Sequence, residues 1–295
     1  MAKTTPAPSF DICAQFPKLA ELAKTTTRLH PAPYADLPSD VSKIGGRFLW
    51  PKNEPWPECP DKRHQYATKT PRLSPVVQLF ARDFPDLPFP PGCDLFQLLW
   101  CPVTEDACAE LMAPAPHAFW RNSQEILEPL AYDPPVDTSE FIEDILLFQE
   151  CIPAPCSVSP EKLLEYPGLY QLPDEIEEAL DQDVYQGEVG PCPSSKVGGY
   201  PFWVEGSDQT PKCDCGRRME FLLQVFDWEY TNIDDPQRWI PLEDRWAVAA
   251  YDANRWDRAA LAVLQPMGFD FHHYAKYVFV CRSCDGWPVK LVEQN

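Results

Sequence analysis

Four cysteines near the C-terminus stand in two closely spaced pairs that could hold a metal ion. Cys213 and Cys215 form C-x-C in PKCDCGRRM, and Cys281 and Cys284 form C-x-x-C in FVCRSCDG. A glycine follows each pair within two residues, which is typical of a zinc knuckle whose backbone amides point at thiolate sulfurs. Four thiolates suit tetrahedral zinc at ~2.3 Å and leave no open position for a catalytic water. We therefore expect one structural zinc site at these four residues.

Three other interpretations of the cysteines stay open at this point. They could be free buried thiols, the two pairs could bind different groups, or C-x-x-C could be a redox pair. The redox interpretation is disfavoured because Cys281 ends an apolar strand-like run. It lacks the helix that lowers the pKa of the thiol in redox motifs.

Motifs for other chemistry are missing from the sequence. The chain has no G-x-S-x-G, no P-loop, no H-E-x-x-H and no G-x-G-x-x-G. His272 and His273 stand in GFDFHHYAKY, where we expect a packing role, with a metal role for His273 as the alternative. We assign no catalytic residue and no cofactor-binding residue, and we expect that the protein is not an enzyme.

The charge of the chain limits the partners that it can have. Its 295 residues carry a formal net charge of -20. Such a surface repels nucleic acid and anionic lipid, whose binding depends on Lys and Arg. It would attract a basic protein at long range. The alternative is that the acidity confers only solubility.

Apolar stretches and cysteines indicate the compartment. The first residues, MAKTTPAPSFDICAQF, lack the apolar core of a signal peptide, and no apolar window is long enough to span a membrane. We expect a cytoplasmic protein, in which the 12 cysteines are reduced. The 35 prolines predict short strands, short helices and long loops.

The same phrase occurs twice along the chain. Residues 42–50 read SKIGGRFLW and residues 195–203 read SKVGGYPFW. Downstream, each phrase is followed by an apolar run centred on glutamine, PVVQLFARDF with Gln78 and EFLLQVFDWE with Gln224. A third run, DLFQLLWCPV or KYVFVCRSCD, then ends in cysteine. Three elements in the same order favour an internal duplication.

The repeated elements predict a predominantly antiparallel β structure of the α+β class. VVQLF and LLQVF are β-branched and apolar runs of strand length. A central Gln in such a run is expected to be buried and to tie its strand to the Gly-Gly loop, and an exposed strand edge is the alternative. The glycine pairs suggest positive φ angles or close backbone approach. The first copy offers only Cys59 and Cys101, with His64 near in sequence, and we expect it to hold no metal.

Four regions follow from this pattern. We expect an N-terminal helical and Pro-rich extension at 1–40, a first repeat half at 41–135, an acidic helical linker at 136–190 and a second half at 191–295. The two halves would form one compact domain. Helices are expected within FDICAQFPKLAELAK, FIEDILLFQE, LPDEIEEALDQ and DANRWDRAALAVLQP.

The repeated phrase and the glutamine run resemble the YwqG-like family, also called domain of unknown function 1963. The second half, SKVGGYPFW with CDCGRRMEFLLQVF and YVFVCRSC, is also similar to the programmed cell death protein 2 group. The resemblance spans residues 42–103 and 195–285. The chain departs from the eukaryotic group because its first copy lacks cysteine pairs and its central segment lacks a MYND-type zinc-finger signature.

The resemblance implies protein binding. Bacterial YwqG-like members include candidate immunity proteins of toxin systems, and the eukaryotic group contains chaperones for a small-subunit ribosomal protein. With the charge of -20, we expect a non-enzymatic immunity protein that sequesters a basic toxin. The alternatives are a chaperone for a basic ribosomal protein and an enzyme with an unrecognised site between the repeats. The loop LWPKNEPWPECP could supply aromatic anchors for a partner or could pack onto the sheets.

Overall fold

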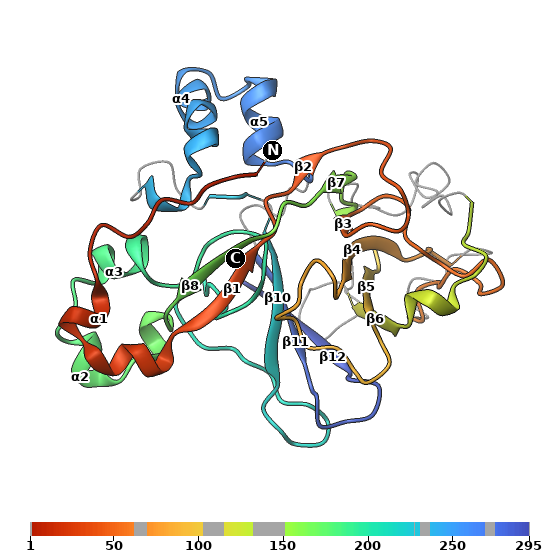
Figure 1. Cartoon of the computed structure of the whole chain (residues 1–295), viewed down its shortest axis with the longest axis horizontal. Coiled ribbons are helices and arrows are strands. Elements are labelled where there is room, and N and C mark those ends of the chain that lie inside the picture. Colours follow the sequence, from red (N-terminus) through yellow and green to blue (C-terminus); the bar gives the residue numbers. More distant parts are fainter. Residues whose placement is uncertain are drawn as a thin grey trace.

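The chain folds as two six-stranded antiparallel sheets with short helices around them, which confirms the expected α+β class (Figure 1). The computed structural model describes residues 2–61, 70–102, 115–131, 151–226, 228–230, 237–268 and 275–294. The strands are β1 (Lys24–Arg28), β2 (Ala32–Pro33), β3 (Lys43–Ile44), β4 (Ser74–Phe80), β5 (Leu95–Trp100), β6 (Pro116–Arg121), β7 (Cys156–Ser157), β8 (Glu161–Glu165), β9 (Lys196–Gly198), β10 (Glu220–Phe226), β11 (Ala275–Val280) and β12 (Val289–Gln294). The α-helices are α1 (Ile12–Gln15), α2 (Asp174–Glu177), α3 (Gln182–Glu188), α4 (Arg245–Ala253) and α5 (Arg258–Leu264).

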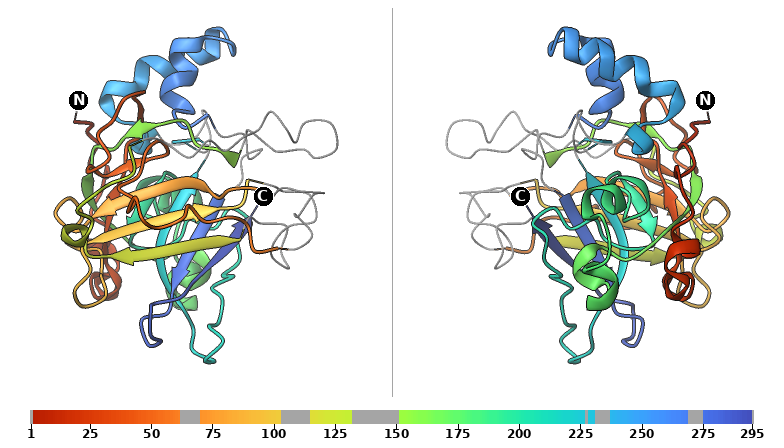
Figure 2. Two further views of the ribbon diagram at one scale, coloured as in Figure 1. Left: turned by 90° about the vertical axis from the view of Figure 1, so that its right-hand side faces the viewer. Right: turned by 90° about the vertical axis from the view of Figure 1, so that its left-hand side faces the viewer.

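The two sheets pack on one another and enclose the main core. One sheet has the order β2-β7-β3-β4-β5-β6 and the other has β12-β11-β10-β9-β1-β8. Figure 2 shows the strands of the two sheets crossing in the centre of the molecule. Their facing side chains form one buried apolar cluster, in which Val77, Phe96 and Trp100 meet Leu223, Val225 and Val278. Burying such side chains supplies the main driving force for the fold.

The two sheets repeat one strand order: β2 to β6 are matched by β8 to β12, six places later, and β7 is matched by β1. Lys43 lies opposite Gln78, and Lys196 lies opposite Gln224. The glycines after each lysine have positive φ, from +59° to +73°. This likeness is geometrical, and descent of the two halves from one duplicated ancestor stays a prediction.

The central glutamines are fully buried and bind the flanks of the repeated phrase, as predicted. Gln78 Oε1 accepts from the Leu49 amide at 2.7 Å, and Gln224 Oε1 accepts from the Phe202 amide at 3.0 Å. Each glutamine Nε2 donates to two carbonyl oxygens of the segment that precedes the lysine. A buried amide is stable there because both of its polar atoms have partners.

The N-terminal extension and the expected linker both contribute strands, so they are parts of the sheets. The chain passes from β1 in one sheet to β2 in the other, and from β7 to β8 in the opposite direction. Each crossing segment pairs with one short central strand: β1 pairs with β9, and β7 pairs with β3. Residues 24–33 and 156–165 thus belong to the two sheets, and the expected division of the chain into four regions stays a prediction.

The helices are shorter than the sequence pattern predicts. Pro17 divides the N-terminal stretch into α1 and a 3₁₀ helix over Pro17–Leu22, since proline lacks the donor that a continuing α-helix needs. Asp257 caps α5 through the amides of residues 259 and 260, so α4 and α5 form a hairpin and the run 252–266 is not one helix. The predicted helix at 141–150 lies outside the described residues. Among the helices that the structure describes, none has the length and apolar character that a membrane span requires.

Candidate metal centre

The four cysteines predicted as metal ligands come together at one end of the second sheet. Cys213 Sγ lies 3.8 Å from Cys284 Sγ, and Cys215 Sγ lies 3.7 Å from Cys281 Sγ. All four sulfurs lie within 4.8 Å of one another. In a tetrahedron with metal–sulfur bonds of ~2.3 Å, neighbouring sulfurs are about 3.8 Å apart. The cluster therefore has the size that a tetrahedral tetrathiolate metal ion requires.

Two loops deliver the cysteine pairs. Cys213 and Cys215 lie in the turn before β10, and Cys281 and Cys284 lie in the turn that joins β11 to β12. The amide of Cys213 donates to the Arg217 carbonyl at 2.8 Å, which closes the first turn. Because β10 and β11 are paired along their length, their ends hold the two turns next to one another.

Backbone amides donate to both thiols of the first pair, Cys213 and Cys215, as a knuckle predicts. The pKa of the exposed Cys215 thiol is lowered to about 7, chiefly because the Arg217 amide donates to its sulfur and also because neighbouring thiols donate to it. Cys213 and Cys281 are buried, against an aromatic layer that contains Trp203 and Phe279. Thiolates stabilised by amides on one side and sheltered on the other suit metal binding.

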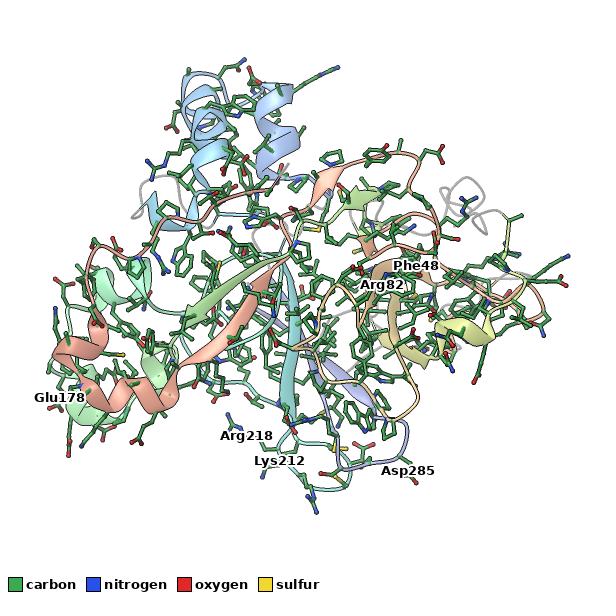
Figure 3. All side chains as sticks on the ribbon, viewed as in Figure 1. Phe48, Arg82, Glu178, Lys212, Arg218 and Asp285 are labelled. Atoms are coloured by element: carbon green, nitrogen blue, oxygen red, sulfur yellow. The ribbon has the colours of Figure 1, made fainter. Side chains whose placement is uncertain are left out.

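Charged side chains tie the two loops together outside the thiols. Lys290 Nζ donates to Asp214 Oδ1 at 2.8 Å, and Arg217 donates to the Ser283 hydroxyl at 3.0 Å. Figure 3 shows Lys212, Arg218 and Asp285 on these loops. Such exposed bonds each contribute ~1 kcal/mol or less, so they cannot replace a metal as the main cross-link.

Within the described residues, the first sheet shows half of this arrangement. Cys101 directly follows β5, and Cys281 directly follows β11, so the pairing registers give these two cysteines equivalent positions. Cys59 and Cys213 are also equivalent, because the same backbone hydrogen bonds form around each of them. The residue two after Cys59 is Asp61, in place of a second thiol. Within the part of the chain that the structure describes, no other three ligand-type side chains approach as closely as the cysteine cluster. His64, and also His272 and His273, lie outside the described residues.

Other strongly perturbed groups are sealed inside the protein. His30 is 1% exposed, and burial lowers its pKa to about 4 although Glu161 Oε2 lies 2.8 Å from its Nε2. Glu229 is also 1% exposed, and burial raises its pKa. The segment around Thr5 covers this region, because its amide and hydroxyl both donate to Glu161. Substrate cannot reach these groups in this conformation.

Two surface features were not picked out from the sequence as structural units. The first is an acidic lobe made by α1, the following 3₁₀ helix, α2 and α3, which pack on a small apolar cluster of their own. The carboxylates were visible in the sequence, but the packing of the N-terminus against residues 166–190 was not. The second is the α4–α5 hairpin, on which Trp246 and Trp256 are exposed.

The Pro-rich loop with Trp50 and Trp56 does not present aromatic anchors. Trp50 is 0% exposed, and its ring lies 4.8 Å from that of Trp56 and 4.9 Å from that of Phe119. Of the two interpretations of this loop, packing onto the sheet is the one that the structure favours.

Comparison with known proteins adds no identity to these observations. No protein-family model matches the chain, and no curated protein sequence matches it. The resemblance to the YwqG-like family and to the programmed cell death protein 2 group therefore stays a prediction that rests on the motifs alone.

Proposed function

We propose that this chain is a non-enzymatic binding protein that captures a basic protein on its acidic lobe and is stabilised by one structural zinc ion. The observation that carries the proposal is the charge of the lobe, defined as residues 10–23 and 166–190. Lys18 is the only basic residue in these two segments. The exposed carboxylates of the lobe are Asp11, Glu21, Asp174, Glu175, Glu178, Asp181 and Asp183.

These carboxylates are available to a partner. Lys18 reaches Glu175 at 3.4 Å with both side chains largely exposed, a pair of small energetic value. Within the described residues no cation forms an ion pair with Asp174, Glu178 or Asp183. Glu178 lies at the outer edge of the molecule (Figure 3). One-signed charge on a projecting surface accelerates and orients the encounter with an oppositely charged protein.

Zinc is the metal proposed for the cysteine cluster. A tetrahedral set of four thiolates suits zinc or an iron–sulfur centre, and zinc is the common structural choice for paired cysteine knuckles. Cys213, Cys215, Cys281 and Cys284 would hold it, and it would supply a cross-link without chemistry of its own. The described cysteines are all free of disulfides, which is consistent with a reducing compartment such as the cytoplasm.

The resemblance stated above suggests two kinds of basic client. As an immunity protein, the chain would sequester a basic toxin; as a chaperone, it would hold a basic ribosomal protein. Both rest on the same acidic lobe. An enzyme with a site between the halves is a weaker alternative, since the perturbed His30 and Glu229 are buried.

A charge-matched pair of variants tests the acidic lobe. A variant with four lobe carboxylates neutralised should no longer recover basic partners from native lysate at moderate salt. Its substitutions are Asp174→Asn, Glu175→Gln, Glu178→Gln and Asp183→Asn. The control neutralises four exposed carboxylates elsewhere, namely Asp36, Glu128, Asp252 and Asp285. Equal recovery by both variants, or no stoichiometric partner with the unmodified chain, would refute capture by the lobe.

Native mass spectrometry before and after chelation tests the metal. The expected mass is that of the chain plus one zinc ion, with metal analysis separating zinc from iron. Cys281→Ser should lose the ion and lower the melting temperature, whereas Cys93→Ser, at a thiol outside the cluster, should keep both. A native mass equal to that of the bare chain would eliminate a stable metal site.

A further inference from the structure

The second sheet contains a gap where its central short strand ends. β9 pairs with β1 only along 26–28 and with β10 only at residues 223 and 224. Gly198 and Gly199, with φ of +69° and +73°, then turn the chain away. Residues 24–25 of β1 and 220–222 of β10 continue past this point with ladder partners described only on their outer sides.

A groove of about 610 Å³ occupies this gap. Its walls include Lys24 and Thr25 from β1 and Glu220 and Phe221 from β10, with the glycine turn at its end. Strands that flank a missing neighbour lie about two strand spacings, or ~9.6 Å, apart. β1 and β10 leave β9 at about this spacing and diverge beyond it (Figure 1), so an extended peptide could form main-chain hydrogen bonds with both strands next to the glycine turn.

The first sheet shows what this position accepts. Ile44 of the first sheet matches Val197 of the second. Cys156 lies opposite Ile44 and Thr27 lies opposite Val197, so Cys156 matches Thr27, and residue 154 matches residue 25. The Ala154 amide donates to the Met267 carbonyl at 2.8 Å. A piece of main chain, residues 266–268, is therefore already bound beside this position in the first sheet. The corresponding Thr25 amide faces the groove in the second.

The side chains around the groove indicate which residues a bound peptide would carry. Met219 and Phe221 supply an apolar surface on one side. Lys24 stands over the Tyr200 ring at 4.0 Å and makes no ion pair within the described residues. The rim also carries Arg218 and Arg282, which are paired with Asp208 and Glu220. Asp86 and Glu220 also line the groove, and Asp86 is paired with Lys162, so within the described residues Lys24 is the lining cation that a peptide carboxylate could pair with.

We propose that this groove binds an extended peptide segment of a partner protein as an added strand between β1 and β10. Alternate side chains of the peptide would contact Phe221, since residues two apart share one face of a strand. A carboxylate of the peptide would pair with Lys24. The groove adjoins the acidic lobe, whose Gln171 lines it, but the proposal does not depend on the proposed function.

The test uses the full chain and two labelled octapeptides of alternating Val and Thr, one with a central Asp and one with a central Lys. Fluorescence polarisation should detect the Asp peptide, and hydrogen exchange should show protection at residues 24–25 and 220–222. The same peptide with alternate amides methylated should bind at least tenfold more weakly, since about two main-chain bonds of ~1 kcal/mol each are lost.

Charge exchange at the rim supplies the matched control. Lys24→Glu should weaken the Asp peptide at least tenfold and strengthen the Lys peptide. Lys52→Glu, an equally large change at an exposed lysine that does not line the groove, should leave both affinities unchanged. Three results would overturn the proposal. They are failure of both peptides to bind the unmodified chain, equal affinity of the methylated and unmethylated peptides, and hydrogen-exchange protection confined to other residues. Circular dichroism of each variant separates loss of binding from loss of folding.

Discussion

The lysine of the second repeated phrase forms a buried ion pair whose loss should be costly. Lys196 and Glu165 are both 0% exposed, and Lys196 Nζ donates to both carboxylate oxygens at 2.8 Å. The same carboxylate accepts from the amides of Cys192 and Tyr200. Replacing Lys196 by Met keeps the length of the side chain but leaves a buried carboxylate without its counter-charge.

Removal of one partner of such a pair costs about 3–5 kcal/mol. For a chain of this size, that loss corresponds to a fall of about 5–8 °C in melting temperature. Lys162→Met provides the control, because Lys162 pairs with Asp86 at 2.6 Å while both side chains are 52% exposed. Loss of this exposed pair should cost ~1 kcal/mol or less.

A second substitution distinguishes the charge from the packing. Glu165→Gln added to Lys196→Met removes the uncompensated charge and keeps an acceptor for one of the two backbone amides, which bind different carboxylate oxygens. The double variant should therefore be more stable than Lys196→Met alone. Urea unfolding at neutral pH measures all four proteins. If Lys196→Met costs no more than Lys162→Met, or if the second substitution fails to restore stability, the ion pair does not hold this region together.

Three further predictions concern stability. Gly199→Ala should destabilise the protein more than Gly46→Ala, as measured by urea unfolding. Both glycines have positive φ, but the new Cβ at residue 199 would lie 2.1 Å from a buried carboxylate oxygen, whereas the new Cβ at residue 46 would lie 3.2 Å from its nearest atom. Equal losses of stability would contradict this difference in contact. Burial lowers the pKa of His30 from 6.5 to about 4, so the unfolded chain binds more protons and stability should fall by up to about 3 kcal/mol as pH falls through that window. His30→Gln should flatten this dependence, and an unchanged slope would refute it. Trp50→Ala should cost about 3–5 kcal/mol, whereas Trp256→Ala should change stability by less than ~0.5 kcal/mol; calorimetry showing similar losses would contradict the assigned burial.

Local patterns predicted the parts of the fold that depend on local chemistry. The apolar runs centred on Gln78 and Gln224 were enough to predict strands with buried amides, and paired cysteines were enough to predict the four-cysteine cluster. The exchange of β1, β2, β7 and β8 between sheets could not be predicted, because pairing across more than a hundred residues leaves no periodic signal. The same is true of the groove, which exists only because β9 stops between two longer strands.

The contrast between the two sheet ends suggests what a metal bound at the four cysteines would contribute. At the first sheet's end, Cys59 and Cys101 are buried in an apolar cluster around Trp50. The Arg121 guanidinium lies 4.3 Å from the centre of the Trp50 ring and donates two hydrogen bonds to Glu54. That end is held by buried area. A tetrathiolate cross-link needs little buried area, so the loops of the second sheet can project into solvent and still be held in place. Arg218 and Arg282 stand on those loops beside the cysteines and line the groove, so the metal would stabilise the rim on which peptide recognition depends.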